Sequence, residues 1–307
     1  MASDQAVEFA SFFADLGQRS SNPNFDLSTV RDTIETMHLA TKEPEGVSYA
    51  EVDAGGVEAL WCIPAGSDLE TVLLHNHMGG SVVTSMHSDR KAAAHIAKAA
   101  GVRSLVVNFR RSPEHKYPAQ VEDVDTAYHW LLEQGYQPNN IASVGHSIGG
   151  YLAVNLALRL RDRGAALPGA ILSISPWCDI TLSGKSIDSN ADRDKLLSRP
   201  LMEFFRSCWL DGTGVEWTDP QVNLLAADLS GLPPIAVFYG EDELLASEAV
   251  EFALRAQAAG NDLVVRPLEA GQHSFIMGAG RVPEVDQAIS EMGSWLRFAL
   301  GLESAVA

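Results

Sequence analysis

The stretch IASVGHSIGGYLAVNLALRLRDRG, residues 141–164, decides both the fold and the chemistry of this chain. Its first residues form a short apolar run that predicts a buried strand, and its second half has the length and composition of a helix. Between them, GHSIG at 145–149 supplies the small residues that let a chain turn sharply from strand to helix. Such a turn exposes a serine hydroxyl at a helix N-terminus, where developing negative charge is stabilised. Ser147 is therefore the predicted nucleophile.

Similar apolar runs recur along the chain and alternate with helical stretches. The further strand-like runs are TVLLH (71–75), SLVVNF (104–109), AILSIS (170–175), IAVFYG (235–240) and LVVRPL (263–268), and the helical stretches are 89–100, 118–134 and 149–163. Strands that are apolar on both faces and alternate with helices are typical of a parallel sheet with right-handed crossovers. The sequence predicts an α/β fold with a mostly parallel central sheet and helices on both faces.

Two segments lie outside this alternation. Residues 1–45 read as two helices with one apolar face each, and residues 184–225 form a polar loop with a helix around Pro200 to Leu210. We interpret residues 184–225 as an insertion over the edge of the sheet. Phe9, Phe12 and Phe13 have no place in a parallel sheet, so they are expected either to roof the substrate pocket as part of a cap or to pack against the core alone. The expected domains are cap helices 1–45, first core part 46–183, cap insertion 184–225 and second core part 226–307.

A serine nucleophile needs a general base, and behind a turn of this kind the acid and then the histidine follow the serine in the chain. Eight of the nine histidines precede Ser147, and only His273 follows it. His273 lies in a loop after a strand-like run, where an imidazole can reach the nucleophile. His273 is the predicted base.

The acid is expected at the carboxyl end of a strand between Ser147 and His273. Glu241, Asp242 and Glu243 stand together at such a place, and side chains that alternate direction cannot all face the base. Asp242 is preferred because its shorter side chain holds the imidazole with less freedom. Asp179 is a weaker rival.

An oxyanion hole needs backbone N–H donors from a loop after an earlier strand and from the residue that follows the serine. The loop HMGG at 77–80 fits this requirement, because glycine lets backbone approach a substrate closely. Gly79, Gly80 and Ile148 are the predicted donors, with His77 and Met78 as the other motif residues.

A metal pair is the alternative interpretation of His75 and His77. No third ligand of the usual spacing accompanies them in the sequence. We therefore expect neither a metal nor another cofactor, and a metal-dependent hydrolase is the weaker hypothesis.

Several motifs in register resemble those of the hormone-sensitive-lipase family of bacterial esterases. They are HMGGSVVTS, FRRSPEHKYPAQVEDVDTAYHWL, GHSIGGYLA, GEDEL and GQHSF, and together they span roughly residues 70 to 300. The resemblance implies the α/β-hydrolase fold with a helical cap, Ser147 as nucleophile, Asp242 as acid and His273 as base. Within the family the chain is similar to the branch that includes monoterpene ε-lactone hydrolases.

The resemblance also covers the loops beside the nucleophile. His77, Gly79 and Gly80 match the family's His-Gly-Gly-Gly loop, and its Tyr-Arg-Leu-Ala-Pro-Glu segment is matched by Arg110, Pro113 and Glu114. Three residues depart from the family pattern: Met78 replaces a loop glycine, His146 the aspartate before the serine, and Ile148 the small residue after it. Met78 and Ile148 are expected to add bulk near the acyl site.

Together these residues predict a metal-independent carboxylesterase that hydrolyses short- to medium-chain esters or lactones through an acyl-enzyme intermediate. An amidase or thioesterase with the same triad is the alternative, as is a catalytically silent ligand-binding homologue.

The composition restricts the partners. A formal charge of -18 disfavours nucleic acid and anionic membrane surfaces, which leaves a small-molecule ester or lactone as the expected partner. The odd count of three cysteines favours a reducing compartment, and the N-terminal residues lack the pattern of a signal peptide. We expect a cytoplasmic protein, and a homodimer is left open.

Overall fold

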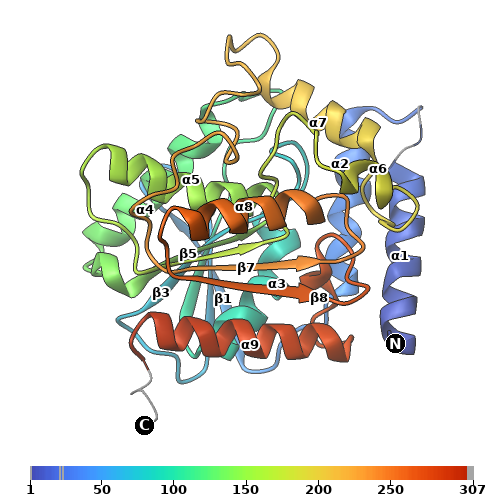
Figure 1. Cartoon of the computed structure of the whole chain (residues 1–307). Helices are drawn as coiled ribbons and strands as arrows, with labels where there is room; N and C mark the ends of the chain where they lie inside the picture. The colour runs from blue at the N-terminus through green and yellow to red at the C-terminus, as the bar shows by residue number, and fades with distance from the viewer. Residues whose placement is uncertain (1, 21, 23, 303–307) are drawn as a thin grey trace.

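The computed structural model describes residues 2–20, 22 and 24–302, which form an α/β fold around one sheet (Figure 1). The eight strands described are arranged in the order β1-β2-β4-β3-β5-β6-β7-β8. β1 and β2 pair antiparallel, β2 pairs antiparallel with β4, and the remaining neighbours are parallel. The strands are β1 (Val47–Asp53), β2 (Glu58–Pro64), β3 (Val72–Asn76), β4 (Arg103–Val107), β5 (Ile141–His146), β6 (Ala170–Ile174), β7 (Ile235–Gly240) and β8 (Leu263–Leu268).

Helices cover both faces of this sheet. α3 packs against α9 on one face, while α4 and α5 pack together on the other, where α8 also lies (Figure 1). The helices of the core are α3 (Met86–Ala100), α4 (Ala119–Glu133), α5 (Ile148–Asp162), α8 (Ala246–Ala258) and α9 (Pro283–Ala299), with short 3₁₀ turns η2 (Pro138–Asn140) and η3 (Phe275–Gly278). The predicted fold class is confirmed.

The central strands explain why the pattern was readable. Every residue of β3, β5 and β6 is buried, because helices cover both faces of the sheet there. Such strands need continuous apolar runs rather than an alternating pattern. These strands carry their carboxyl ends to one edge of the sheet, which is where ligands bind in open α/β sheets.

The remaining helices gather near that edge (Figure 1). They are α1 (Asp4–Ser20), α2 (Leu27–Glu35) and η1 (Thr36–Ala40) from the N-terminal segment, and α6 (Ser186–Ser189) and α7 (Arg199–Leu210) from the segment between β6 and β7. Asp26 caps α2 by accepting a hydrogen bond from Thr29 N at 2.8 Å, and Ser198 caps α7. Among the described helices, none is both long and apolar enough to cross a membrane.

Candidate active site

The turn from β5 to α5 places Ser147 in a backbone conformation that few residues adopt, with φ 58° and ψ −125°. The glycines on either side are required by close packing. A Cβ on Gly145 would lie 2.2 Å from the carbonyl oxygen of Gly149, and one on Gly149 would lie 2.0 Å from that of Asn76. The tight turn therefore depends on both glycines, and it presents Ser147 at the N-terminus of α5.

The structure brings Ser147 and His273 together across 126 residues of sequence. Ser147 Oγ donates to His273 Nε2 at 2.9 Å, and His273 Nδ1 donates to Glu243 Oε2 at 3.1 Å. Both His273 and Glu243 are buried. We call Ser147, His273 and Glu243 the serine triad. A carboxylate in this position fixes the imidazole tautomer that accepts the serine proton.

The expectation that Asp242 contacts His273 is wrong. Asp242 instead forms an ion pair with Arg193, and Glu243 takes the place beside the imidazole. The physical reason is local. β7 ends at Gly240, and the chain turns there, with Glu243 N donating to Gly240 O at 3.3 Å, so strand alternation no longer decides which side chain faces the base. Glu243 was one of the three adjacent carboxylates that the sequence offered as the acid, and Asp242 was preferred to it.

The segment between β6 and β7 holds this turn in place. Asn190 Nδ2 donates to the carbonyl oxygens of Glu241 and Glu243, both at 2.9 Å. Buried Asp194 accepts from Leu244 N at 2.8 Å and, through its other oxygen, from the N–H of Leu196 and Leu197. The backbone that carries Glu243 is thus positioned by residues about fifty positions earlier in the chain.

Burial shapes the electrostatics around Ser147. It raises the pKa of Glu243, although the hydrogen bond from His273 opposes this effect. It also lowers the pKa of His77 and of His146 to about 4, so both imidazoles are neutral at pH 7.

The loop after β3 is arranged to expose its N–H groups. His77 Nδ1 and Thr84 Oγ1 both donate to the carbonyl of Met78 at 2.7 Å, which turns the opposite side of that peptide, the N–H of Gly79, away from them. Among the described residues, no oxygen accepts a hydrogen bond from the N–H of Gly79, Gly80 or Ile148. Three unpaired donors beside Ser147 are suited to an oxyanion.

A narrow cavity of about 30 Å³ opens above Ser147. Met78 and Trp177 line it, among others, and apolar side chains from the N-terminal segment and from the segment between β6 and β7 complete its walls. These side chains are Ile34 and Met37 of the N-terminal segment and Leu196, Leu197, Leu201, Met202 and Phe205 of the later one. The expectation that Phe9, Phe12 and Phe13 roof the pocket is wrong, because none of them lines it. Phe9 and Phe13 are instead buried in the main hydrophobic core.

Arg31 of α2 ties the N-terminal segment to the loops beside the cavity. Its guanidinium donates to the carbonyls of Val82 and Ser112 at 2.8 Å and forms a two-pronged pair with Glu114 at 2.7 Å. The same guanidinium lowers the pKa of Glu114 to about 2. Of the motif segment, Arg110 contacts Asp123 instead, with Nε 2.9 Å from Oδ1. Arg110 and Glu114 of this motif therefore hold neighbouring parts of the structure together.

Several other candidates lie away from the reacting atoms. Asp179 accepts from Thr181, Ser183 and Asn223 rather than from His273. Ile148 is fully buried and does not line the cavity, so the bulk it was expected to add near the acyl site is not seen, whereas Met78 does line it.

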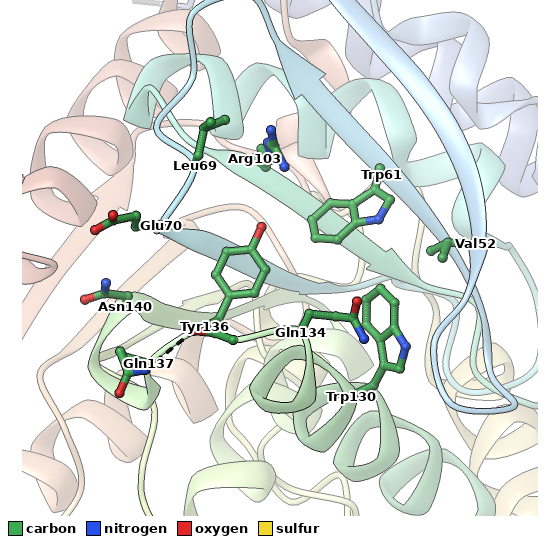
Figure 2. Close-up of a pocket in the computed structure, with 11 residues that line it drawn as sticks. Val52, Trp61, Leu69, Glu70, Arg103, Trp130, Gln134, Tyr136, Gln137 and Asn140 are labelled. Carbon is green, nitrogen blue, oxygen red and sulfur yellow. Dashed lines mark hydrogen bonds between the residues drawn. The ribbon is translucent and has the colours of Figure 1, made fainter.

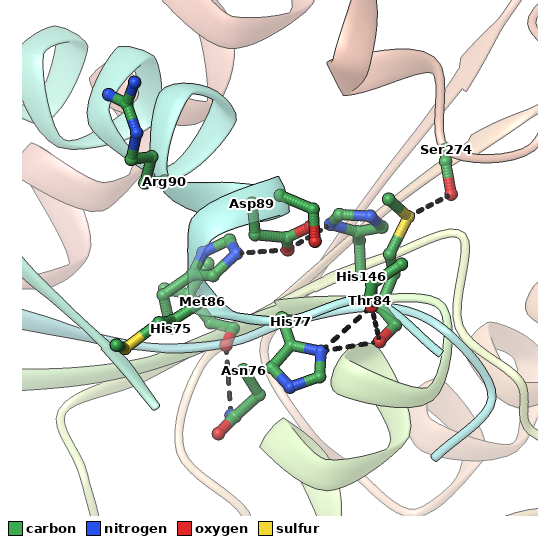
Figure 3. A network of polar contacts seen from close by, with 12 residues as sticks. His75, Asn76, His77, Thr84, Met86, Asp89, Arg90, His146 and Ser274 are labelled. Atoms are coloured by element: carbon green, nitrogen blue, oxygen red, sulfur yellow. Dashed lines mark hydrogen bonds and ion pairs between the residues drawn. The ribbon is translucent and has the colours of Figure 1, made fainter. Parts of the chain in front are cut away.

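His75 and His77 do not form a pair. Their side chains point to opposite faces of the sheet, as alternate residues of an extended chain do (Figure 3). His77 stacks on Phe109 with ring centroids 3.8 Å apart. His75 instead meets Asp89 and His146 in a buried cluster that sequence spacing did not reveal.

A wider hollow of about 700 Å³ lies at the amino ends of β3, β4 and β5, far along the strands from Ser147. Figure 2 shows its aromatic wall of Trp61, Trp130 and Tyr136, with Arg103 and Asn140 at its edge. No residue of the serine triad lines it. The triad residues Ser147 and His273 line the smaller cavity and not this larger hollow.

Comparisons with known proteins agree with the observed fold. Residues 73–277 match the family described as alpha/beta hydrolase fold. The solved structure of an esterase from the bacterial hormone-sensitive lipase family is 34% identical and superposes with a TM-score of 0.92, covering 98% of this chain and 100% of that one. The chain belongs to this family of bacterial esterases.

Two curated relatives extend the comparison. An acetyl-hydrolase of Streptomyces hygroscopicus is 35% identical over 81% of this chain and 83% of its own length. An esterase of Acinetobacter venetianus is 28% identical over 76% of this chain and 77% of its own. The chain is a serine carboxylesterase, a hydrolase of carboxylic esters.

Proposed function

We propose that this esterase hydrolyses esters with short acyl chains, with Ser147 as nucleophile, His273 as general base and Glu243 as the acid that orients the base. The observation that carries the proposal is the position of Ser147, hydrogen-bonded to His273 at the floor of a narrow apolar cavity. The related acetyl-hydrolase of Streptomyces hygroscopicus is named for a small acyl group, which supports a short acyl chain here.

Each group has a step in the reaction. Ser147 Oγ attacks the acyl carbon while its proton passes to His273 Nε2, and Glu243 stabilises the imidazolium that results. His273 then protonates the leaving alcohol, and the acyl-enzyme remains. A water molecule that loses its proton to His273 attacks the acyl-enzyme and releases the acid.

The oxyanion of each tetrahedral intermediate would lie among the N–H groups of Gly79, Gly80 and Ile148. Their freedom from other acceptors supports this assignment. Losing one such donor typically costs ~3 kcal/mol of transition-state stabilisation, so the loop matters as much as the triad.

The cavity sets the expected chain length. Its volume is about 30 Å³, where a single water needs roughly 10–15 Å³ on the same scale. Acetyl to butyryl groups should fit with small movements of the apolar walls, and longer chains should require larger ones. The two segments 1–45 and 184–225 would then act as a cap, since each supplies part of that wall.

A panel of p-nitrophenyl esters from acetate to decanoate tests the proposal on wild-type enzyme. The values of kcat/KM should be highest for acetate to butyrate and fall steeply beyond them. A maximum at decanoate would contradict the assignment of the cavity as the acyl site.

Two neighbouring phenylalanines of α7 provide a matched pair of variants. Phe205 lines the cavity and its ring packs on Gly80, whereas Phe204 is 43% exposed and does not line it. Phe205→Ala should raise the hexanoate-to-acetate ratio of kcat/KM about tenfold. Phe204→Ala should leave that ratio unchanged, and equal effects of the two changes would reject the cap wall.

The compartment is part of the proposal as well. Cys62, Cys178 and Cys208 are free thiols, which suits a reducing cytoplasm. Localisation of the tagged chain in cell fractions would test it.

A further inference from the structure

A second cluster of chemistry-bearing side chains lies behind the nucleophile turn. His75 comes from β3, Asp89 from the first turn of α3, and His146 from the end of β5. Figure 3 shows the three side chains converging. All three are fully buried, and none lines the cavity above Ser147. We call them the His-Asp-His cluster.

The cluster holds polar atoms that the protein does not satisfy. Among the described residues, neither ring nitrogen of His146 has a hydrogen-bond partner, and neither does Asp89 Oδ1. A buried polar atom without a partner destabilises the fold, and more so when its group is charged. A metal ion held between the three side chains would give His146 Nδ1 the partner that it lacks.

The donor atoms lie at the spacing of a metal site. Asp89 Oδ2 is 3.1 Å from His75 Nε2 and 3.4 Å from His146 Nδ1, and all three donors lie within 4.8 Å of one another. A tetrahedral zinc ion with bonds of about 2.0–2.2 Å holds its ligand atoms roughly 3.3–3.5 Å apart. Two imidazoles and one carboxylate are ligands that this ion accepts readily.

We propose that the His-Asp-His cluster binds one zinc ion through His75 Nε2, Asp89 Oδ2 and His146 Nδ1, with a water molecule as the fourth ligand. Each imidazole would bind through the nitrogen that faces Asp89 and keep its proton on the other. The ion would join β3, α3 and β5 directly behind the turn that carries Ser147. Because the cluster does not reach the cavity, the ion would stabilise the fold and take no part in ester hydrolysis.

Metal content and spectroscopy test this proposal on the full chain without a histidine tag. The protein is unfolded with chelator, refolded with excess Zn²⁺ or Co²⁺, desalted and analysed by mass spectrometry. About one ion per chain is expected. The cobalt form should show the visible ligand-field bands of a four-coordinate site, and zinc should raise the Tm by at least about 3 °C.

Variants of the cluster test whether the ion binds there. Asp89→Asn and His146→Gln should each lose the cobalt bands and the bound ion, while His129→Gln, a change at an exposed histidine, should keep both. Ser147→Ala should bind metal as wild type does, which separates this proposal from the esterase assignment. The wild-type spectrum remains decisive if a cluster variant does not fold.

Two results would overturn the proposal. One is a wild-type chain that holds less than about a tenth of an ion after refolding in excess zinc and shows no cobalt bands. That result would leave the cluster a metal-free hydrogen-bonded network. The other is an ion that folded Asp89→Asn and His146→Gln both retain, because it must then lie elsewhere.

Discussion

Two places in this molecule set a buried imidazole 3.1 Å from a buried carboxylate: His273 beside Glu243, and His75 beside Asp89. The pairs differ at the second ring nitrogen. His273 Nε2 faces Ser147 Oγ at the floor of a cavity, whereas His75 Nδ1 has no hydrogen-bond partner among the described residues. In the function proposed above, the first pair serves turnover because Ser147 lies beside it with access to the cavity, whereas the second pair, without such a neighbour, serves stability.

Among the substitutions considered, replacement of the proposed nucleophile Ser147 should have the largest effect on activity. Ser147→Ala should lower ester turnover at least ~10,000-fold, because no other hydroxyl faces His273 among the residues that the structure describes. The measurement is kcat for p-nitrophenyl butyrate, with circular dichroism to show that the fold remains. Ser143→Ala, a change at a buried serine of β5, the strand that leads to Ser147, should keep nearly full activity. A folded Ser147→Ala enzyme with near wild-type kcat would refute the serine mechanism.

The acid gives the next largest effect. Glu243→Gln keeps the shape of the side chain but removes the charge that stabilises the imidazolium, so kcat should fall ~100-fold, or ~2.7 kcal/mol. Asp242→Asn serves as its control, since Asp242 pairs with Arg193 and should lose less than about threefold. If the two variants exchanged these outcomes, the hydrogen bond from His273 to Glu243 would not be the productive one.

The turn at Ser147 and the position of Glu243 show which parts of the site can be predicted from sequence alone. The nucleophile turn was predictable because its constraint is local: Gly145 and Gly149 leave no room for a Cβ, and a strand and a helix adjoin them. The place of Glu243 was not predictable. It depends on a turn fixed by Asn190 and Asp194, which are distant in sequence.

The His-Asp-His cluster and the cavity walls were not predicted for the same reason: both depend on residues that are distant in sequence. The His-Asp-His cluster assembles from β3, α3 and β5, so no short spacing announces it. The cap was expected from its composition, but which of its apolar residues reach the cavity depends on how α2 and α7 pack. Ile34 and Met37 took the place that the N-terminal phenylalanines were expected to fill.

The His-Asp-His cluster should respond to mutation in stability rather than turnover. Asp89→Asn removes the anion that both imidazoles face and should lower the free energy of unfolding by about 2–4 kcal/mol. Urea titration measures the loss, and kcat of the folded variant at low temperature should stay within about threefold of wild type. A ~100-fold loss of kcat with unchanged stability would mean that this cluster belongs to the reaction.

A third buried carboxylate sharpens the comparison, because no imidazole accompanies it. Glu248 of α8 accepts hydrogen bonds from Cys178 N at 2.6 Å and Asp179 N at 3.3 Å. Burial raises its pKa well above the ordinary value, and the nearby charges of Asp179 and Glu243 add to this. Because no cationic side chain forms an ion pair with Glu248 among the described residues, the neutral acid is the form that the fold prefers.

The sign of the pH dependence follows from that shift. Below the pKa of the unfolded chain, about 4.3, Glu248 is protonated in both states and costs nothing. As pH rises further, the unfolded chain releases the proton while the folded chain keeps it, so wild-type stability falls until the raised folded pKa is passed.

Glu248→Gln mimics the neutral acid and lacks this loss. Its stability relative to wild type should therefore improve with pH, by at most about 1.4 kcal/mol per pH unit. Urea unfolding at pH 5, 7 and 9 measures the difference, and Glu251→Gln, an exposed change on the same helix, should show no such trend. A constant difference between wild type and Glu248→Gln would mean that Glu248 is ionised in the folded protein.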